Sequence, residues 1–187
     1  MIEIKHHTAH ANGIRQHYLD AGSGAPVVLL HGFPETSYAW RYQIPELAKS
    51  YRVIAPDLRG YGATDKPASG YDKRNMAKDV RELMRTLNIG KAAIVGHDRG
   101  ARVATRFAKD HRDAIDRLVV MDNVPTRIVA RDFDASTAKA FGSSCSTSSR
   151  TYPRRSLPVV RTYGCNTSSP TGATIPMLFL ARHLRPM

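Results

Sequence analysis

The sequence lacks several features that would set it apart from ordinary globular proteins. No run of about 18 apolar residues occurs, so the sequence predicts no membrane-spanning helix and no membrane partner. The opening residues, MIEIKHHTAHANG, lack the apolar core of a secretory signal, which predicts a cytoplasmic protein. Two cysteines are too few for a disulfide framework. With these classes excluded, the sequence indicates a globular protein. Its 187 residues are enough for one domain with a sizeable core.

Acidic residues are missing from one part of the chain. Residues 1–141 hold 22 Lys and Arg against all 16 Asp and Glu, a net charge of +6. Residues 142–187 hold six Arg and no Lys or acid, which gives the other +6 of the total +12. The same segment contains Cys145, Cys165 and fourteen Ser and Thr, with little apolar periodicity. We therefore expect a globular part over 1–141 and a disordered, low-complexity tail over 142–187.

Short apolar runs alternate with helical patterns along the first part. An opening hairpin is predicted at 3–5 and 14–19, and buried strands at 26–30, 51–55, 91–95 and 117–121. Helices are predicted at 38–48, with Ser37 as the cap, and at 75–87 and 100–108. This alternation predicts an α/β fold with a mostly parallel sheet and helices on both faces.

The turn with the most chemical content follows the strand at 91–95. Its sequence, VGHDRG, places Asp98 between Gly96 and Gly100, the layout that serine hydrolases use around their nucleophile. Small residues two positions away on each side allow a sharp reversal that lifts one side chain off the sheet. A carboxylate there can displace a halide or open an epoxide, forming an ester with the enzyme. The alternative is that Asp98 simply caps a helix.

Two other strand exits lie at the same predicted edge of the sheet. HGFPE, residues 31–35, offers the backbone N–H of Phe33, which could join that of Arg99 as an oxyanion or leaving-group site. The alternative for this turn is a tight Gly-Pro turn without a ligand. Residues 57–67, DLRGYGATDKP, suit a structural loop across the sheet edge.

The segments HGFPETSYAWR, DLRGYGATDKP and GHDRGAR together resemble the α/β-hydrolase family over roughly residues 10 to 135. They resemble most its aspartate-nucleophile branch: epoxide hydrolases, haloalkane dehalogenases and haloacetate dehalogenases. The resemblance implies a small-molecule substrate, no cofactor or metal, Asp98 as the nucleophile, and the Phe33 and Arg99 amides as the oxyanion hole. A serine-type esterase is disfavoured because Asp occupies the nucleophile position.

Three further residues separate the candidate activities. The resemblance implies that Asp122 orients the catalytic histidine, although Asp122 could equally be a turn acid before Pro125. In haloacetate dehalogenases, arginines at the positions of Arg99 and Arg102 hold the substrate carboxylate. The alternative is that both are solvated residues at a helix start. Epoxide hydrolases more often carry an aromatic residue directly after the nucleophile.

The histidine that activates water in this family has no counterpart that we can assign. His183 is the only histidine after His111, and its surroundings, ARHLRPM, do not resemble the family's histidine loop. The helical cap of the family is likewise not recognisable. We therefore expect an epoxide hydrolase-like protein whose present chain is inactive, or alkylates Asp98 once and stalls.

The composition of residues 142–187 is typical of a shifted reading frame. Ser codons of the TCN type, read one base earlier, encode Phe, Leu, Ile or Val, and Thr codons encode Tyr, His, Asn or Asp. The loss of one nucleotide just before Gly142 would turn an apolar, acidic segment into the observed Ser-, Thr- and Arg-rich one. On this hypothesis the chain is a truncated hydrolase without its cap and C-terminal core. The gene sequence tests it: restoring one base near codon 142 must open a long, family-like frame.

The charge of +12 leaves a different class of function open, a non-catalytic basic binding protein. Such a protein would carry a basic stripe interleaved with aromatic residues, which the sequence does not show. We therefore predict no nucleic-acid partner.

Overall fold

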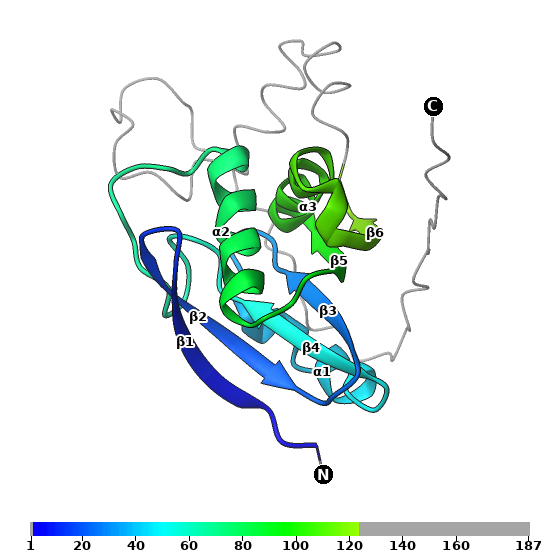
Figure 1. Ribbon diagram of the computed structural model, residues 1–187. Coiled ribbons are helices and arrows are strands. Elements are labelled where there is room, and N and C mark those ends of the chain that lie inside the picture. The colour runs from blue at the N-terminus through cyan, green and yellow to red at the C-terminus, as the bar shows by residue number, and fades with distance from the viewer. Residues whose placement is uncertain (1, 124–187) are drawn as a thin grey trace, which may run out of the picture. The chain divides into compact units, whose positions relative to one another are not determined.

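The computed structural model describes residues 2–123, which form a twisted six-stranded sheet with helices packed against it (Figure 1). The spatial order of the strands is β1-β2-β4-β3-β5-β6. In chain order the elements are β1 (Lys5–Ala11), β2 (Ile14–Ala21), β3 (Ala25–Leu30), the 3-10 helix η1 (Ser37–Trp40), α1 (Gln43–Leu47), β4 (Tyr51–Pro56), α2 (Lys73–Thr86), β5 (Ala92–His97), α3 (Asp98–Asp110), the 3-10 helix η2 (Arg112–Ala114) and β6 (Ile115–Met121).

Four neighbouring strands run parallel. Strand β3 pairs in parallel with β4 on one side and with β5 on the other, and β5 pairs in parallel with β6. Strands β1 and β2 form an antiparallel hairpin, and β2 joins β4 antiparallel. The carboxyl ends of the parallel strands therefore lie along one edge of the sheet, where open α/β sheets bind ligands.

Apolar side chains cover both faces of the sheet, as the sequence predicts. On one face, α2 and α3 contribute Met76, Val80, Leu83 and Phe107 to a cluster with Val28 and other strand residues. On the other face, Trp40 and Ile44 from η1 and α1 pack with Leu29 and Val53. The expected α/β class, with a mostly parallel sheet between helices, is confirmed.

The predicted helix over 38–48 is wrong as one continuous element. The chain instead forms η1 and α1, separated at residues 41 and 42, and Thr36 rather than Ser37 caps η1 by accepting a hydrogen bond from the Tyr38 amide. Pro45 provides the physical reason, because it has no N–H to donate to the carbonyl four residues earlier. A proline fits only in the first turn of a helix, which is where α1 places it.

The opening strand also differs from the prediction of 3–5. Strand β1 covers Lys5–Ala11, and the turn at Asn12 and Gly13, both with positive φ, is where the sequence placed it. Only Ala9 and Ala11 of this strand are buried, so it lacks the large apolar residues that mark a strand in sequence. Pairing with β2 along its full length holds it in place.

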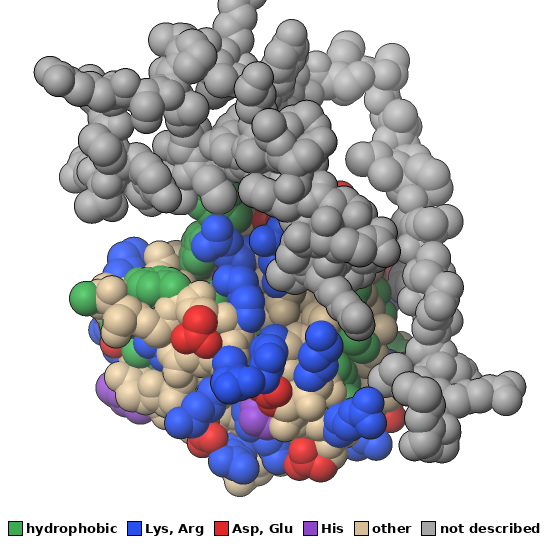
Figure 2. Space-filling model, turned by 90° about the horizontal axis from the view of Figure 1, so that it is seen from above, with side chains coloured by type: hydrophobic (Ala, Val, Ile, Leu, Met, Phe, Trp, Pro, Cys, Tyr) green, Lys and Arg blue, Asp and Glu red, His purple; other side chains and the backbone are tan. Residues whose placement is uncertain are grey.

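Charged side chains of both signs share the surface of the described residues. Figure 2 shows Lys and Arg side chains lying beside Asp and Glu side chains and among uncharged ones on the face that it presents. None of the helices within residues 2–123 has the length and apolar character needed to cross a bilayer. The expectations for the tail over 142–187 fall outside the described residues and stay predictions.

Candidate active site

Asp98 stands at a sharp turn between β5 and α3, as the sequence predicts. Its backbone has φ +42°, a left-handed conformation that non-glycine residues rarely adopt. A Cβ added at Gly100 would lie 2.6 Å from the carbonyl oxygen of His31. A Cβ added at Gly96 would lie 2.7 Å from backbone atoms of Ala101. Side chains at these two glycines would therefore clash with backbone, which is why the turn needs residues without a Cβ.

The turn after β3 brings a backbone donor to this carboxylate. The Phe33 amide donates a hydrogen bond to Asp98 Oδ2 at 2.9 Å. Gly32 lies directly beside the pair, because an added Cβ there would be 3.0 Å from Asp98 Cβ. One oxygen of Asp98, Oδ2, is thus held by the backbone of the neighbouring turn.

His31 links this turn to the loop after β4. Its Nε2 accepts a hydrogen bond from the Leu58 amide at 2.9 Å, so the ring proton lies on Nδ1, which donates to the Gly32 carbonyl at 2.8 Å. Burial lowers the pKa of His31, even though the Gly32 carbonyl and nearby carboxylates favour the charged form. The neutral ring therefore holds the Gly32 carbonyl in place, and with it the Phe33 amide, which belongs to the same peptide unit.

Arg99 enters the site through its side chain. Its guanidinium lies over the Phe33 ring, 5.1 Å from the centroid, and over the Tyr61 ring at 5.9 Å. The Tyr61 ring in turn meets His31 edge to face, with the centroids 5.2 Å apart. Arg99, a predicted site residue, therefore lies beside the turn that carries Phe33. Its guanidinium stacks on an aromatic wall formed by the rings of Phe33 and Tyr61.

A second group of side chains lies around His97, the residue before Asp98. Glu35 Oε2 accepts a hydrogen bond from the Gly32 amide at 2.8 Å and lies 3.1 Å from His97 Nδ1. On its other side, His97 Nε2 is 3.7 Å from Asp122 Oδ2. Asp122 follows β6 with φ +48°, and its side chain is 88% exposed. Asp122 thus lies at the expected edge of the sheet and reaches toward His97.

Two cations accompany Arg99 at this edge. Arg102, one turn along α3, donates from Nε to Asn123 Oδ1 at 3.4 Å. Burial, together with the charges of Arg99 and Arg102, lowers the pKa of Lys73 to about 8. These three side chains therefore share one electrostatic neighbourhood, which favours an anionic group on a ligand.

Sequence reasoning missed three members of this arrangement. Glu35 and Tyr61 belong to the segments HGFPE and RGYG, which drew attention through their glycines and proline rather than through these side chains. Lys73 opens α2 and is distant from Asp98 in sequence. A signal was present only for Glu35, as an acid placed directly after a strand-exit turn.

The chain matches a known protein family over much of its length. This match agrees with the geometry of the turn at Asp98 and its backbone donor, the Phe33 amide. A sequence model described as the alpha/beta hydrolase fold family matches residues 25–142. The chain belongs to the α/β-hydrolase family. Within this family, the matched relatives place it in the branch of epoxide hydrolases and dehalogenases.

Two relatives illustrate that branch. A soluble epoxide hydrolase of Corynebacterium sp. (strain C12) is 54% identical over 130 residues, which is 70% of this chain and 46% of the relative. A fluoroacetate dehalogenase of Burkholderia sp. is 44% identical over 125 residues, 64% of this chain and 41% of the relative. The chain thus spans less than half the length of these two curated relatives.

Solved structures show the same relationship. The structure of the epoxide hydrolase CorEH matches with a TM-score of 0.63 and 45% identity, covering 76% of this chain and 56% of that one. An epoxide hydrolase from Vigna radiata matches with a TM-score of 0.63 and 40% identity, covering 66% and 39%. The family match to the α/β-hydrolase fold ends at residue 142, where the composition of the chain changes.

Proposed function

We propose that this chain carries the nucleophilic half of an epoxide hydrolase, with Asp98 as the attacking group. The hydrogen bond from the Phe33 amide to Asp98 Oδ2, at 2.9 Å, is the observation on which the proposal rests. It leaves the second carboxylate oxygen to attack a ring carbon of the epoxide. The ring C–O bond breaks, and the released oxygen takes a proton from solvent, so that a hydroxyalkyl ester of Asp98 forms.

The same amide has a role in the second half of such a reaction. When water adds to the ester carbon, negative charge develops on the former Oδ2, and the Phe33 N–H is already aimed at that atom. Collapse of this intermediate releases the diol and restores the carboxylate. This step needs a base that takes a proton from the water. We propose a histidine for this role, with Asp122 as the acid that orients it.

Among residues 2–123, neither histidine of this edge, His31 or His97, is assigned this role in the proposal. His97 lies between Glu35 and Asp122, and His31 is buried with both ring nitrogens engaged. His183 is the only histidine after His111 in the sequence. We therefore propose that the ester forms and persists, because the step that removes it has no general base.

A mass measurement of the intact chain tests this proposal. After both cysteines are blocked by alkylation, incubation with styrene oxide should add the mass of one epoxide per chain, while the diol released stays below one equivalent. A chain that releases many equivalents of diol would contradict the proposed stall. A chain that gains no mass would contradict the nucleophile.

The cations near Asp98 favour a second candidate function, dehalogenation of a halogenated carboxylic acid. Arg99 and Arg102 lie on the first turns of α3, and their charges reach Lys73. A guanidinium suits a carboxylate because it can donate two parallel hydrogen bonds. Chloroacetate in place of styrene oxide separates the two candidates, since the dehalogenase reaction releases one chloride per chain as the ester forms.

A further inference from the structure

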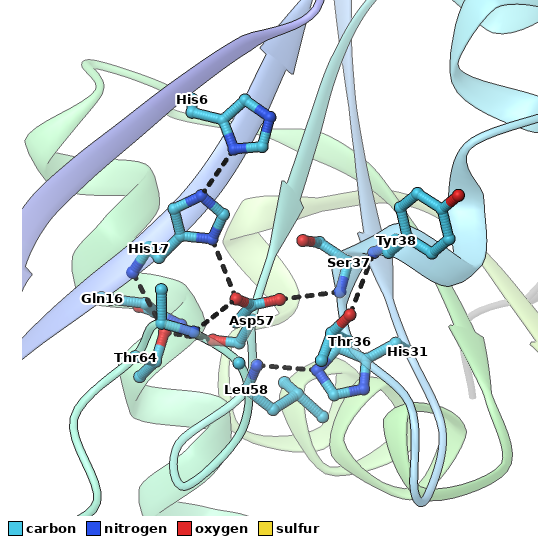
Figure 3. A network of polar contacts seen from close by, with 12 residues as sticks. His6, Gln16, His17, His31, Thr36, Ser37, Tyr38, Asp57, Leu58 and Thr64 are labelled. Carbon is cyan, nitrogen blue, oxygen red and sulfur yellow. Dashed lines mark hydrogen bonds and ion pairs between the residues drawn. The ribbon is translucent and has the colours of Figure 1, made fainter.

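A row of three polar side chains, His6, His17 and Asp57, lies on the hairpin side of the sheet (Figure 3). His6 on β1 faces His17 on β2, with His6 Nδ1 and His17 Nε2 3.1 Å apart. The other nitrogen of His17, Nδ1, lies 2.9 Å from Asp57 Oδ2, just beyond the end of β4. The His17 and Asp57 side chains are 13% and 4% exposed, whereas His6 is open to solvent.

Backbone amides hold the carboxylate of Asp57 in place beside His17. Its Oδ1 accepts from the Ser37 amide at 2.7 Å, and its Oδ2 accepts from the Ala63 amide at 3.0 Å. Both carboxylate oxygens of Asp57 therefore accept from backbone amides, an arrangement that suits an ionised carboxylate. A carboxylate accepts from His17 Nδ1–H, so the lone pair of His17 lies on Nε2 and faces His6.

We propose that His6 and His17 chelate one divalent transition-metal ion, with Asp57 as the carboxylate that supports His17 from behind. Two imidazole nitrogens on a tetrahedral zinc ion, each about 2.0–2.1 Å from the metal, are about 3.3 Å apart. The observed separation of 3.1 Å is close to this value. The ion takes the place of the proton between the two rings, and His6 then carries its own proton on Nε2 instead of Nδ1.

The donor set selects the kind of metal. Two imidazoles favour Zn²⁺, Ni²⁺ and Cu²⁺ over Mg²⁺ and Ca²⁺, which prefer oxygen ligands. A carboxylate hydrogen-bonded to the far nitrogen of a ligating histidine is a recurrent feature of zinc sites. No group of three or more His, Cys, Asp or Glu side chains within residues 2–123 is arranged to hold a metal, so water completes the coordination here.

Binding at this site would join parts of the fold that are distant in the sequence. His6 lies on the edge strand β1, whereas His17 is tied through Asp57 to the Ser37 amide before α1 and the Ala63 amide after β4. A ligand that binds only the folded state shifts the equilibrium toward it. The metal should therefore raise the melting temperature of the protein.

Zinc titration of the tag-free chain, with Cys145 and Cys165 alkylated, tests the proposal. Calorimetry should show one saturable Zn²⁺ per chain and thermal denaturation a rise in Tm, whereas Mg²⁺ should give neither. His6→Gln, at an exposed position that leaves the His17–Asp57 contact intact, should weaken binding by at least about tenfold and remove the rise.

His7→Gln is the matched control, because His7 is the next residue on β1 and lies on the other face of the hairpin. Its ring stacks on that of Tyr18, with the ring centroids 5.4 Å apart. This variant should bind Zn²⁺ like the unchanged protein. The proposal would be overturned if His6→Gln bound Zn²⁺ as well as the unchanged protein does. It would also be overturned if His7→Gln lost as much binding as His6→Gln, or if no saturable binding occurred.

Discussion

Asp98→Asn should lose the covalent adduct with styrene oxide, with a fall of at least about a thousandfold in the rate of alkylation. An amide oxygen is a far weaker nucleophile than a carboxylate, so the ester cannot form at a measurable rate. The fold should survive the change, because asparagine tolerates the positive φ of this position better than most residues. The Phe33 amide can still donate to the side-chain oxygen. Intact-mass spectrometry over time measures the loss.

Asp116→Asn provides the control for that experiment. Asp116 is also an aspartate in the described region, but its side chain is 58% exposed and pairs only loosely with the neighbouring Arg117 at 3.8 Å. This variant should form the adduct at the rate of the unchanged chain. An adduct of undiminished rate in Asp98→Asn would refute the proposed nucleophile.

Asp79→Ala should lower the free energy of unfolding by about 3–5 kcal/mol, because it leaves a buried guanidinium without its partner. Arg59 contacts Asp79 through two hydrogen bonds, Nε to Oδ2 at 2.9 Å and an Nη to Oδ1 at 2.6 Å. The two side chains are only 6% and 2% exposed. Asn12 also donates to Asp79 Oδ1 at 2.6 Å, which ties the first hairpin to α2. Urea denaturation measures the change.

Two comparisons show whether burial causes this loss. Asp113→Ala removes the partner of Arg81 in an ion pair whose acid is 77% exposed, and should cost less than about 1 kcal/mol. The double variant Arg59→Met with Asp79→Leu should recover much of the stability, because it leaves no unpaired charge. If Asp79→Ala and Asp113→Ala were equally stable, the buried pair would not hold the loop after β4 to α2.

The parts of the fold that the sequence predicts well are those with strong local signals. The runs PVVLL and RLVVM and the helical pattern from Met76 to Leu87 each mark their element through large apolar residues. The predicted start of this helix, Asn75, is later than the observed one. Helix α2 begins at Lys73, because the side chain of Asp72 caps it by accepting from the Arg74 and Asn75 amides. Strand order has no such local signal, because β4 lies between β2 and β3 through pairing across long connections.

The candidate site divides in the same way. The turn around Asp98 is predictable because glycines at fixed spacing have a direct steric cause. The contact of Phe33 with Asp98 spans 65 residues of sequence, and the sequence suggests it because both residues follow strands whose carboxyl ends share one edge of the sheet. The aromatic wall of Phe33 and Tyr61 beneath Arg99 depends on three separate loops and elements, and sequence reasoning assigned no such role to Tyr61. The shifted-frame hypothesis for residues 142–187 stays a prediction, which the gene sequence tests.

The position of the covalent label tests the central claim most directly. After cysteine alkylation and reaction with styrene oxide, the chain is digested and the peptide around residues 97–99 is sequenced by tandem mass spectrometry. The account predicts that the added mass lies on the Asp98 side chain. A label on His97, on Glu35 or on a peptide outside this turn would contradict it.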